Sequence, residues 1–209
     1  MDYSITLNDY LQSLSSKAPT PGGGNVSAFS GVLAASLAIM VCNLTIGKKK
    51  YVDVESEMID LKNKLENLKN RFSELADEDN KAFEKVMEAF KLPKETDKEK
   101  LERAAKIDEA TLGAAEVPSD VVNVCKQILP NIKTIVIKGN QNSLSDAGVA
   151  ASLVNTAAEG AFLNVLINCT SLSNQTLGNE FLKRTEIIYE EVKISCAEII
   201  ELINNKLRS

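Results

Sequence analysis

The sequence predicts an all-α protein, a single multi-helix bundle over residues 1–209 with one long central amphipathic helix. Aromatic residues make up only 5% of the chain and tryptophan is absent, so the core must be packed with aliphatic side chains on helix formers. Apolar residues recur at alternating steps of four and three between Val54 and Phe90, which is a helical period. No convincing strand is visible, because the β-branched run from Thr134 to Ile137 lies inside a helical pattern.

The composition excludes several classes of function. The net charge of −5 disfavours nucleic acid as the main partner, because no strong basic stripe is available to neutralise phosphates. The absence of histidine removes the commonest general base, the usual catalytic triads and most zinc sites, so we expect no metal. The four cysteines are far apart and form no CxxC pair, which is typical of reduced core thiols in a cytoplasmic protein. Residues 1–14 show no signal peptide.

The first expected helix is short and leads into a loop rich in proline and glycine. It begins at Thr6, where Asp9 completes a capping box, and runs to about Ser16. The loop Thr20–Asn25 contains three consecutive glycines, and a long segment without any charge follows it.

The charge-free segment Val26–Ile46 is expected to be a buried helix that is capped by Asn25 or Ser27 and ended by Gly47. Its length is also sufficient to cross a bilayer. However, it carries several small and polar residues, and no second span of comparable purity exists, so we expect no membrane association.

The cleanest pattern in the chain is the long amphipathic helix, which should end before Leu92. Its apolar stripe comprises Val54, Met58, Leu61, Leu65, Leu68, Phe72 and Leu75, and continues with Ala82, Val86 and Phe90.

Three more helical regions are expected after the long helix. A capping box at Thr96 opens the first, Pro118 should break it, and Ser119 should start a second part. Pro130 should kink that part, and Gly139 should end it. The remaining helices are expected from Ser145, as the cap, to about Ile167, and from Asn179 to Leu207.

The glycine loop is the first candidate for function. Gly22, Gly23 and Gly24 let a ligand touch bare backbone, and the free N–H groups of the following helix favour a carboxylate or another electron-rich group. The alternative is a stiff turn that leads into a buried helix. Three glycines at a helix start exceed what a turn needs, so a ligand-contacting role is favoured.

Asp79 is the candidate for chemistry. The stepping of the apolar stripe puts this acid on the face that elsewhere carries aliphatic residues, and among residues 77–80 only Asp79 falls there. A buried carboxylate is costly unless it is paired or neutralised, and burial would raise its pKa towards neutrality. The alternative is a structural acid satisfied by a lysine or by a helix cap, and periodicity alone does not decide between the two.

Three further groups are polar in otherwise apolar surroundings. Asn140, Ser145 and Asp146 lie in a loop between two helices, which is either an ordinary connection or a place where small residues let a ligand approach. Asn164 and Asn168 share one helix face and could bridge helices or bind a heterocycle. The cluster Lys48–Lys50 is by default a solvated helix end.

Several motifs in order and spacing resemble those of the cyclodeaminase/cyclohydrolase family, the C-terminal half of formimidoyltransferase-cyclodeaminase and its stand-alone bacterial relatives. The similarity covers nearly the whole chain, and Asn25 stands where the family usually has serine. The motifs are Pro19–Gly24, Asn43–Tyr51, Asp77–Phe83, Leu92–Lys94 and Ser145–Gly148.

The resemblance implies an all-helical, commonly dimeric enzyme that acts on the one-carbon unit between N5 and N10 of tetrahydrofolate and needs no metal or prosthetic group. The reaction would be deamination of 5-formimidoyltetrahydrofolate to 5,10-methenyltetrahydrofolate, or hydrolysis of the latter to 10-formyltetrahydrofolate; a non-catalytic folate-binding module is the alternative. By the family's pattern Asp79 is the catalytic acid or base. The expected substrate-binding residues are Gly22, Gly23, Gly24, Asn140, Ser145, Asp146, Asn164, Asn168, Lys48 and Lys49, with the lysines facing the glutamate tail.

Overall fold

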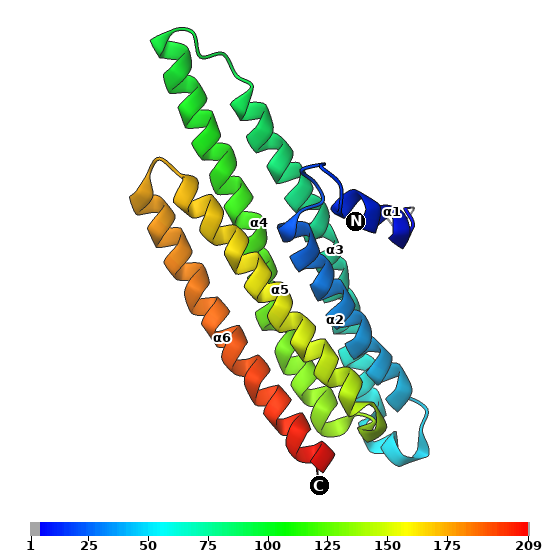
Figure 1. The fold of residues 1–209 in the computed structure, drawn as a ribbon. Coiled ribbons are helices and arrows are strands. Elements are labelled where there is room, and N and C mark those ends of the chain that lie inside the picture. Colours follow the sequence, from blue (N-terminus) through cyan, green and yellow to red (C-terminus); the bar gives the residue numbers. More distant parts are fainter. Residues whose placement is uncertain (1–4, 209) are drawn as a thin grey trace.

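The computed structural model describes residues 5–208 and shows a helical protein without a strand in that range (Figure 1). The all-α prediction is therefore confirmed, while residues 1–4 and 209 of the predicted domain lie outside the described part. The α-helices are α1 (Leu7–Leu14), α2 (Gly23–Thr45), α3 (Glu55–Phe90), α4 (Asp97–Lys138), α5 (Leu144–Ser171) and α6 (Gln175–Arg208), with short 3₁₀ helices η1 (Lys49–Val54) and η2 (Gln141–Ser143).

The five long helices run along one common direction (Figure 1). Helix α2 packs against α3 and α5, α4 packs against α3, α5 and α6, and α5 packs against α6. The short helix α1 lies on the outside, next to α2 and α3, and the hairpin of α3 and α4 extends beyond the other helices (Figure 1). Because α3, α4 and α6 contain 36, 42 and 34 residues, the expected single long helix is one of three in the described chain.

The apolar stripe of α3 forms the centre of the core as predicted. Met58, Leu65, Phe72 and Leu75 are completely buried. The aromatic ring of Phe72 lies so close to Gly31 that a Cβ there would be 2.4 Å from it, so α2 and α3 approach closely at this point. The same stripe leaves the core near its end.

The predicted apolar stripe continues to Phe90 in the sequence, but its last part does not belong to the core. The tip of the α3–α4 hairpin has no further helix to pack against. Phe90 is 48% exposed, and Leu101, facing outward from α4, is 74% exposed. Periodicity reports which face of a helix is apolar, and the length of the neighbouring helices decides how much of that face is covered.

Pro118 does not break the chain into two helices, which corrects the prediction, because α4 continues through both Pro118 and Pro130. The reason is tertiary packing. Pro118 is buried, and Ser119 uses its hydroxyl for a 2.9 Å hydrogen bond to Thr185 of α6 and caps no new helix. Burial of the flanking apolar face outweighs the one lost backbone hydrogen bond of a proline.

Other boundaries also differ from the expectation. The N-cap residue of α2 is Gly22, which has no side chain of its own to cap the helix, and Asn25 is already inside the helix. Helix α5 begins at Leu144, so Ser145 is not its cap, and α6 begins four residues before Asn179. The capping boxes at Thr6 and Thr96 are confirmed, and so are four buried, unpaired cysteines.

By length and composition alone, two segments of the described chain could cross a bilayer, Gly23–Thr45 and Gln141–Ser171. In the first, 67% of the most apolar window is buried against other helices. The core helix of a soluble protein passes the same test, so these segments are weak evidence for a membrane.

Candidate functional site

A cavity of about 370 Å³ lies where the N-terminus of α2 meets α3, α4 and α5. It brings together six of the residues that the sequence singled out: the three glycines, Asp79, Asn164 and Asn168. The rest of its lining is apolar or carries small hydroxyl groups. The complete lining consists of Pro19, Thr20, Gly22, Gly23, Gly24, Asp79, Phe83, Val86, Ala114, Asn164, Ile167, Asn168 and Ser171.

The glycines form the first turn of α2 and permit close contact with α3. A Cβ on Gly24 would lie 2.1 Å from Oδ1 of Asp79, so only glycine allows the carboxylate to sit there. The Val26 N–H closes the first helical hydrogen bond, to the carbonyl of Gly22, at 3.0 Å. The backbone N–H groups before Val26 therefore have no partner within the helix and form the positive end of the helix dipole.

Asp79 carries the only ionisable side chain in the described lining of the cavity. Burial raises its pKa, and a hydrogen bond from the backbone N–H of Asn25 opposes this shift. The carboxylate thus caps α2 from a neighbouring helix, the structural role that periodicity had left open. Because it also borders a cavity and has a raised pKa, the same group is available for proton transfer.

The residues beside Asp79 have different environments. Glu78 accepts a 2.6 Å ion-pair hydrogen bond from Arg71, and this bond raises the pKa of the Arg71 guanidinium. Asn80 buries its Oδ1 without a hydrogen-bond partner among the described residues. This corrects the expectation that only Asp79, among the four polar residues 77–80, faces inward.

Asn164 and Asn168 line the cavity from α5, and each is oriented by one backbone carbonyl. The Nδ2 of Asn164 donates to the carbonyl of Gly160 at 2.8 Å, and the Nδ2 of Asn168 donates to that of Ala114, also at 2.8 Å. Each amide retains its carbonyl oxygen and a second N–H for a ligand. Bridging of helices and ligand binding are therefore compatible for these residues, because Asn168 bridges α4 and α5 and both asparagines line the cavity.

The remaining predicted site residues lie at the other end of α2. Asn140 donates from its backbone N–H to Thr45 Oγ1 at 2.9 Å and from Nδ2 to the carbonyl of Leu44 at 3.0 Å. A helix of 23 residues places this end about 34 Å from the glycines. We call this group the distal cluster; it consists of Lys48, Lys49, Asn140, Ser145 and Asp146.

The separation corrects the expectation that the glycine loop and Asp146 with Asn140 hold the same heterocycle within one chain. A reduced pterin that touches Asp79 is out of reach of the distal cluster of its own chain. This distance cannot be read from the sequence, because it depends on the antiparallel course of α2 and α5 (Figure 1).

Sequence reasoning missed part of the cavity wall. Phe83, Val86 and Ile167 supply an apolar wall, and Thr20 and Ser171 supply hydroxyl groups. Phe83 and Thr20 lie in the motifs Asp77–Phe83 and Pro19–Gly24, which was the available signal. Ser171 has no signal in the sequence, because its place depends on where α5 ends.

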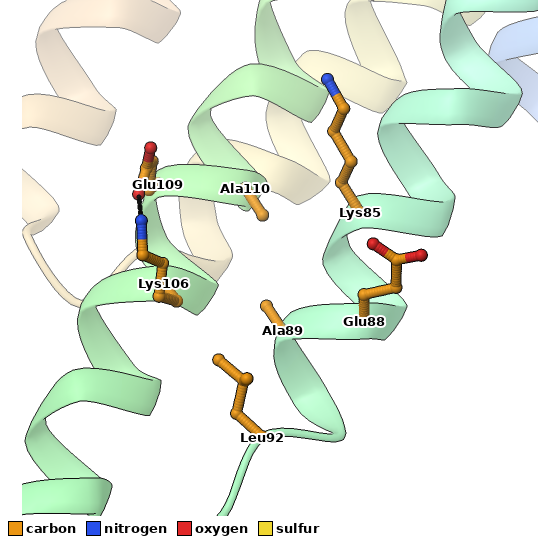
Figure 2. A pocket seen from close by; sticks show the side chains of 7 residues that line it. All are labelled: Lys85, Glu88, Ala89, Leu92, Lys106, Glu109 and Ala110. Carbon is orange, nitrogen blue, oxygen red and sulfur yellow. Dashed lines mark hydrogen bonds and ion pairs between the residues drawn. The ribbon is translucent and has the colours of Figure 1, made fainter.

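A second hollow runs between α3 and α4 near the hairpin tip (Figure 2). Lys85 and Glu88 line it from α3, and Lys106 lines it from α4, where it forms a 2.7 Å ion pair with Glu109 (Figure 2). Its charged groups are exposed and of both signs, whereas the described lining of the first cavity has a single, half-buried acid. Within residues 5–208 no cluster of three or more histidine, cysteine or acidic residues could hold a metal ion.

Comparisons with known proteins agree with the motifs. The sequence profile of the formiminotransferase-cyclodeaminase family matches residues 6–187. The chain is 41% identical over 202 residues to methenyltetrahydrofolate cyclohydrolase of Methylorubrum extorquens, covering 97% of both chains. It is 30% identical to formimidoyltransferase-cyclodeaminase of Mus musculus, covering 93% of this chain and 36% of that protein.

A solved structure shares the fold. The crystal structure of formiminotetrahydrofolate cyclodeaminase from Thermotoga maritima superposes with a TM-score of 0.82 at 32% identity, covering 98% of this chain and 96% of that one. A profile match over most of the chain and relatives at this identity establish homology. The chain therefore belongs to the formiminotransferase-cyclodeaminase family.

Proposed function

We propose that the protein is a folate one-carbon enzyme that hydrolyses 5,10-methenyltetrahydrofolate to 10-formyltetrahydrofolate. The observation that carries the proposal is a single half-buried carboxylate, Asp79, in a cavity that otherwise offers apolar surface, backbone N–H groups and two amides. Hydrolysis is favoured because a relative with 41% identity over 97% of both chains is a cyclohydrolase. No prosthetic group is required.

The proposed chemistry needs only proton transfer. Asp79, as the carboxylate, removes a proton from water as the oxygen attacks the methenyl carbon, and a tetrahedral carbon forms between N5 and N10. The same group then returns the proton to N5 as the C–N5 bond breaks, and the hydroxyl on the tetrahedral carbon loses its remaining proton to solvent to become the carbonyl of the formyl group, which stays on N10. A pKa raised towards neutrality suits both steps, and such a group contributes on the order of 10²–10⁴-fold.

Cyclodeamination is the second candidate, favoured by the structural match to a cyclodeaminase. In that reaction N10 attacks the formimidoyl carbon, Asp79 takes the N10 proton, and the amino group leaves as ammonia after protonation. Both reactions use the same tetrahedral carbon, so the same acid serves either. A non-catalytic binding module is disfavoured, because desolvating an acid in the cavity costs free energy that simple binding would not require.

One absorbance assay separates these functions. The purified protein is mixed with 5,10-methenyltetrahydrofolate and, separately, with 5-formimidoyltetrahydrofolate, and the methenyl absorbance is followed. Loss of the signal in the first mixture above the spontaneous rate supports the hydrolase, and its appearance in the second supports the deaminase. No change in either mixture, with the substrate bound, would leave only the binding module.

We further propose that the active form is a homodimer in which two chains pair antiparallel through α2 and α5. Helix α2 is free of charge along its length, and no helix of the described chain covers its outward face or that of α5 (Figure 1). Exposed apolar side chains occur on both helices, among them Leu33, Leu44, Val149 and Leu163. Exposed apolar side chains on two neighbouring helices that no further helix covers are typical of an interface.

The distal cluster supports this pairing. Leu33 lies near the middle of α2, so a two-fold axis close to it brings the C-terminal end of α2 to the N-terminal end of the partner helix. Lys48, Lys49 and Asp146 of one chain would then border the cavity that contains Asp79 of the other. The lysines would face the anionic glutamate tail of the substrate. We propose in addition that the protein is cytoplasmic and binds neither nucleic acid nor a membrane.

Substitutions in the proposed interface and in the shared site test the dimer. Leu33→Asp should convert the dimer to a monomer in light scattering and abolish activity, because a charge would be buried in the interface. Ile194→Asp, at an exposed position of α6 outside this face, should change neither property. Mixing inactive Asp79→Asn with an inactive Asp146→Ala variant should restore part of the activity. Full activity of monomeric Leu33→Asp would overturn the shared site.

A further inference from the structure

Helix α1 touches the rest of the protein through one buried side chain. Of its eight residues only Tyr10 is buried, while Leu7 and Leu11 are exposed. The Tyr10 ring packs on Phe29 of α2 with a centroid distance of 5.3 Å. Its hydroxyl donates a 2.9 Å hydrogen bond to Oδ1 of Asn25. Because Tyr10 is the one buried side chain of α1, any specific role of this helix should depend on the contacts of Tyr10.

Asn25 forms hydrogen bonds at the point where α1, α2 and α3 meet. It is 3% exposed, and besides accepting from Tyr10 it donates from Nδ2 to the carbonyl of Ala76 at 2.8 Å. Its backbone N–H donates to the carboxylate of Asp79. Asn25 therefore contacts α3 at Ala76 and again at Asp79, about one helical turn further along.

The distance between α2 and α3 at this point can hardly change without displacing the Asp79 carboxylate. The Asp79 carboxylate fits against Gly24 only because no Cβ is present. The Asn25 side chain bridges the same two helices one turn away, so its hydrogen bonds determine how closely they approach. A shift of either helix would lengthen the contact between the Asn25 N–H and the carboxylate.

We propose that Tyr10 and Asn25 are positioning residues: Tyr10 orients the Asn25 side chain, and Asn25 fixes α2 against α3 so that the Asp79 carboxylate is held at the cavity. This inference rests on the proposed role of Asp79 and adds that α1 is the element that completes the site. It also gives a use for asparagine at position 25, since a shorter serine could not reach both Tyr10 and the carbonyl of Ala76.

The surroundings of Asp79 allow its titration to be followed without interference from a second ionisable group in the described cavity lining. No other ionisable side chain lines the cavity from α2, α3, α4 or α5 in the described chain, and Tyr10 of α1 is held in its hydrogen bond to Asn25. The N–H of Asn25 is the contact that favours the ionised form of Asp79, while burial opposes that form. Loss of this contact with burial unchanged should raise the pKa of Asp79 further.

The test is Tyr10→Phe, which removes the hydroxyl and keeps the ring on Phe29. We expect kcat to fall about tenfold with a smaller change in KM, because the acid is misplaced while the substrate still binds. The Asp79 carboxyl resonance, assigned by its absence in Asp79→Asn, should titrate at higher pH in a ¹³C NMR experiment. Asn25→Ser should move both readouts in the same direction.

The matched control is Ser119→Ala, which removes a buried hydroxyl bond of equal length between α4 and α6. It should lower thermal stability and leave kcat and the Asp79 titration unchanged. If Tyr10→Phe and Asn25→Ser behave like this control, the positioning role is wrong. The NMR readout does not need turnover, so an unaltered titration refutes the positioning role even if the wild type proves inactive, whereas inactivity with a shifted titration refutes only the proposed reaction.

Discussion

Asp79→Asn should lower kcat by on the order of 10²–10⁴-fold while the protein remains folded. The amide has the shape of the carboxylate and can still accept the hydrogen bond from the Asn25 N–H, but it cannot take or give a proton. Methenyltetrahydrofolate absorbance gives the rate, and circular dichroism confirms the helical content. The same substitution should remove the part of the pH–rate profile that depends on this carboxyl.

The stability of this variant provides an internal check with a definite sign. Because the pKa of Asp79 is raised in the folded protein, the native state binds the proton more tightly than the unfolded chain. The ionised group therefore lowers the free energy of unfolding as the pH rises from the ordinary aspartate value through the raised one. Asp79→Asn should match the wild type at acidic pH and be the more stable protein at neutral pH in urea denaturation.

Two outcomes would contradict this assignment. Full turnover of Asp79→Asn would show that the proton is carried by another group. A large loss of stability at neutral pH would show that the carboxylate is needed chiefly as the cap of α2. Glu78→Gln is the matched control, because it removes an adjacent acid that pairs with Arg71 outside the cavity, and it should leave kcat near the wild-type value.

Gly24→Ala should lower kcat about a hundredfold, because it displaces the acid from its place. The added methyl group would lie 2.1 Å from Oδ1 of Asp79, and the side chain that must move is the carboxylate itself. A carboxylate can rotate away from the intruding methyl group. The change in unfolding free energy should therefore stay below the 1–3 kcal/mol that is typical of overpacking a rigid core.

Gly113→Ala provides the control for this substitution. It also changes a helical glycine, but a Cβ there meets nothing within 4 Å. We expect unchanged activity and a gain in stability of about 0.5–1 kcal/mol, the usual preference for alanine over glycine within a helix. Wild-type kcat in Gly24→Ala, measured with the absorbance assay, would exclude the close contact as a requirement for catalysis.

The local sequence pattern was sufficient to predict features that depend on a single face of one helix. The stripe from Met58 to Leu75 predicted the buried face of α3, and the interruption of that stripe pointed to Asp79 by helical spacing alone. The three glycines predicted a place of close approach, and the approach is to that same acid. Spacing also put Asn164 and Asn168 on one face of α5, and both line the cavity.

Local rules failed where a neighbouring helix outweighs them. Pro118 should end a helix by its own chemistry, yet α4 continues because its flanking faces are buried against other helices. Asn25 has the side chain of a helix cap, but it bonds to Tyr10 and Ala76, residues 15 and 51 positions away in the chain. Such partners have no period in the sequence and cannot be found from it.

The sequence by itself determined the helical class, the family through its motifs, and the one acid that interrupts an apolar face. Each of these depends on short spacings, where the geometry of a helix relates position in the chain to position in space. Only the tertiary structure decided that Asp79 meets the N-terminus of α2 and that Asn140, Asp146 and the lysines lie at its opposite end. Those relations depend on how long helices are packed against one another, which is fixed by contacts between residues far apart in the chain.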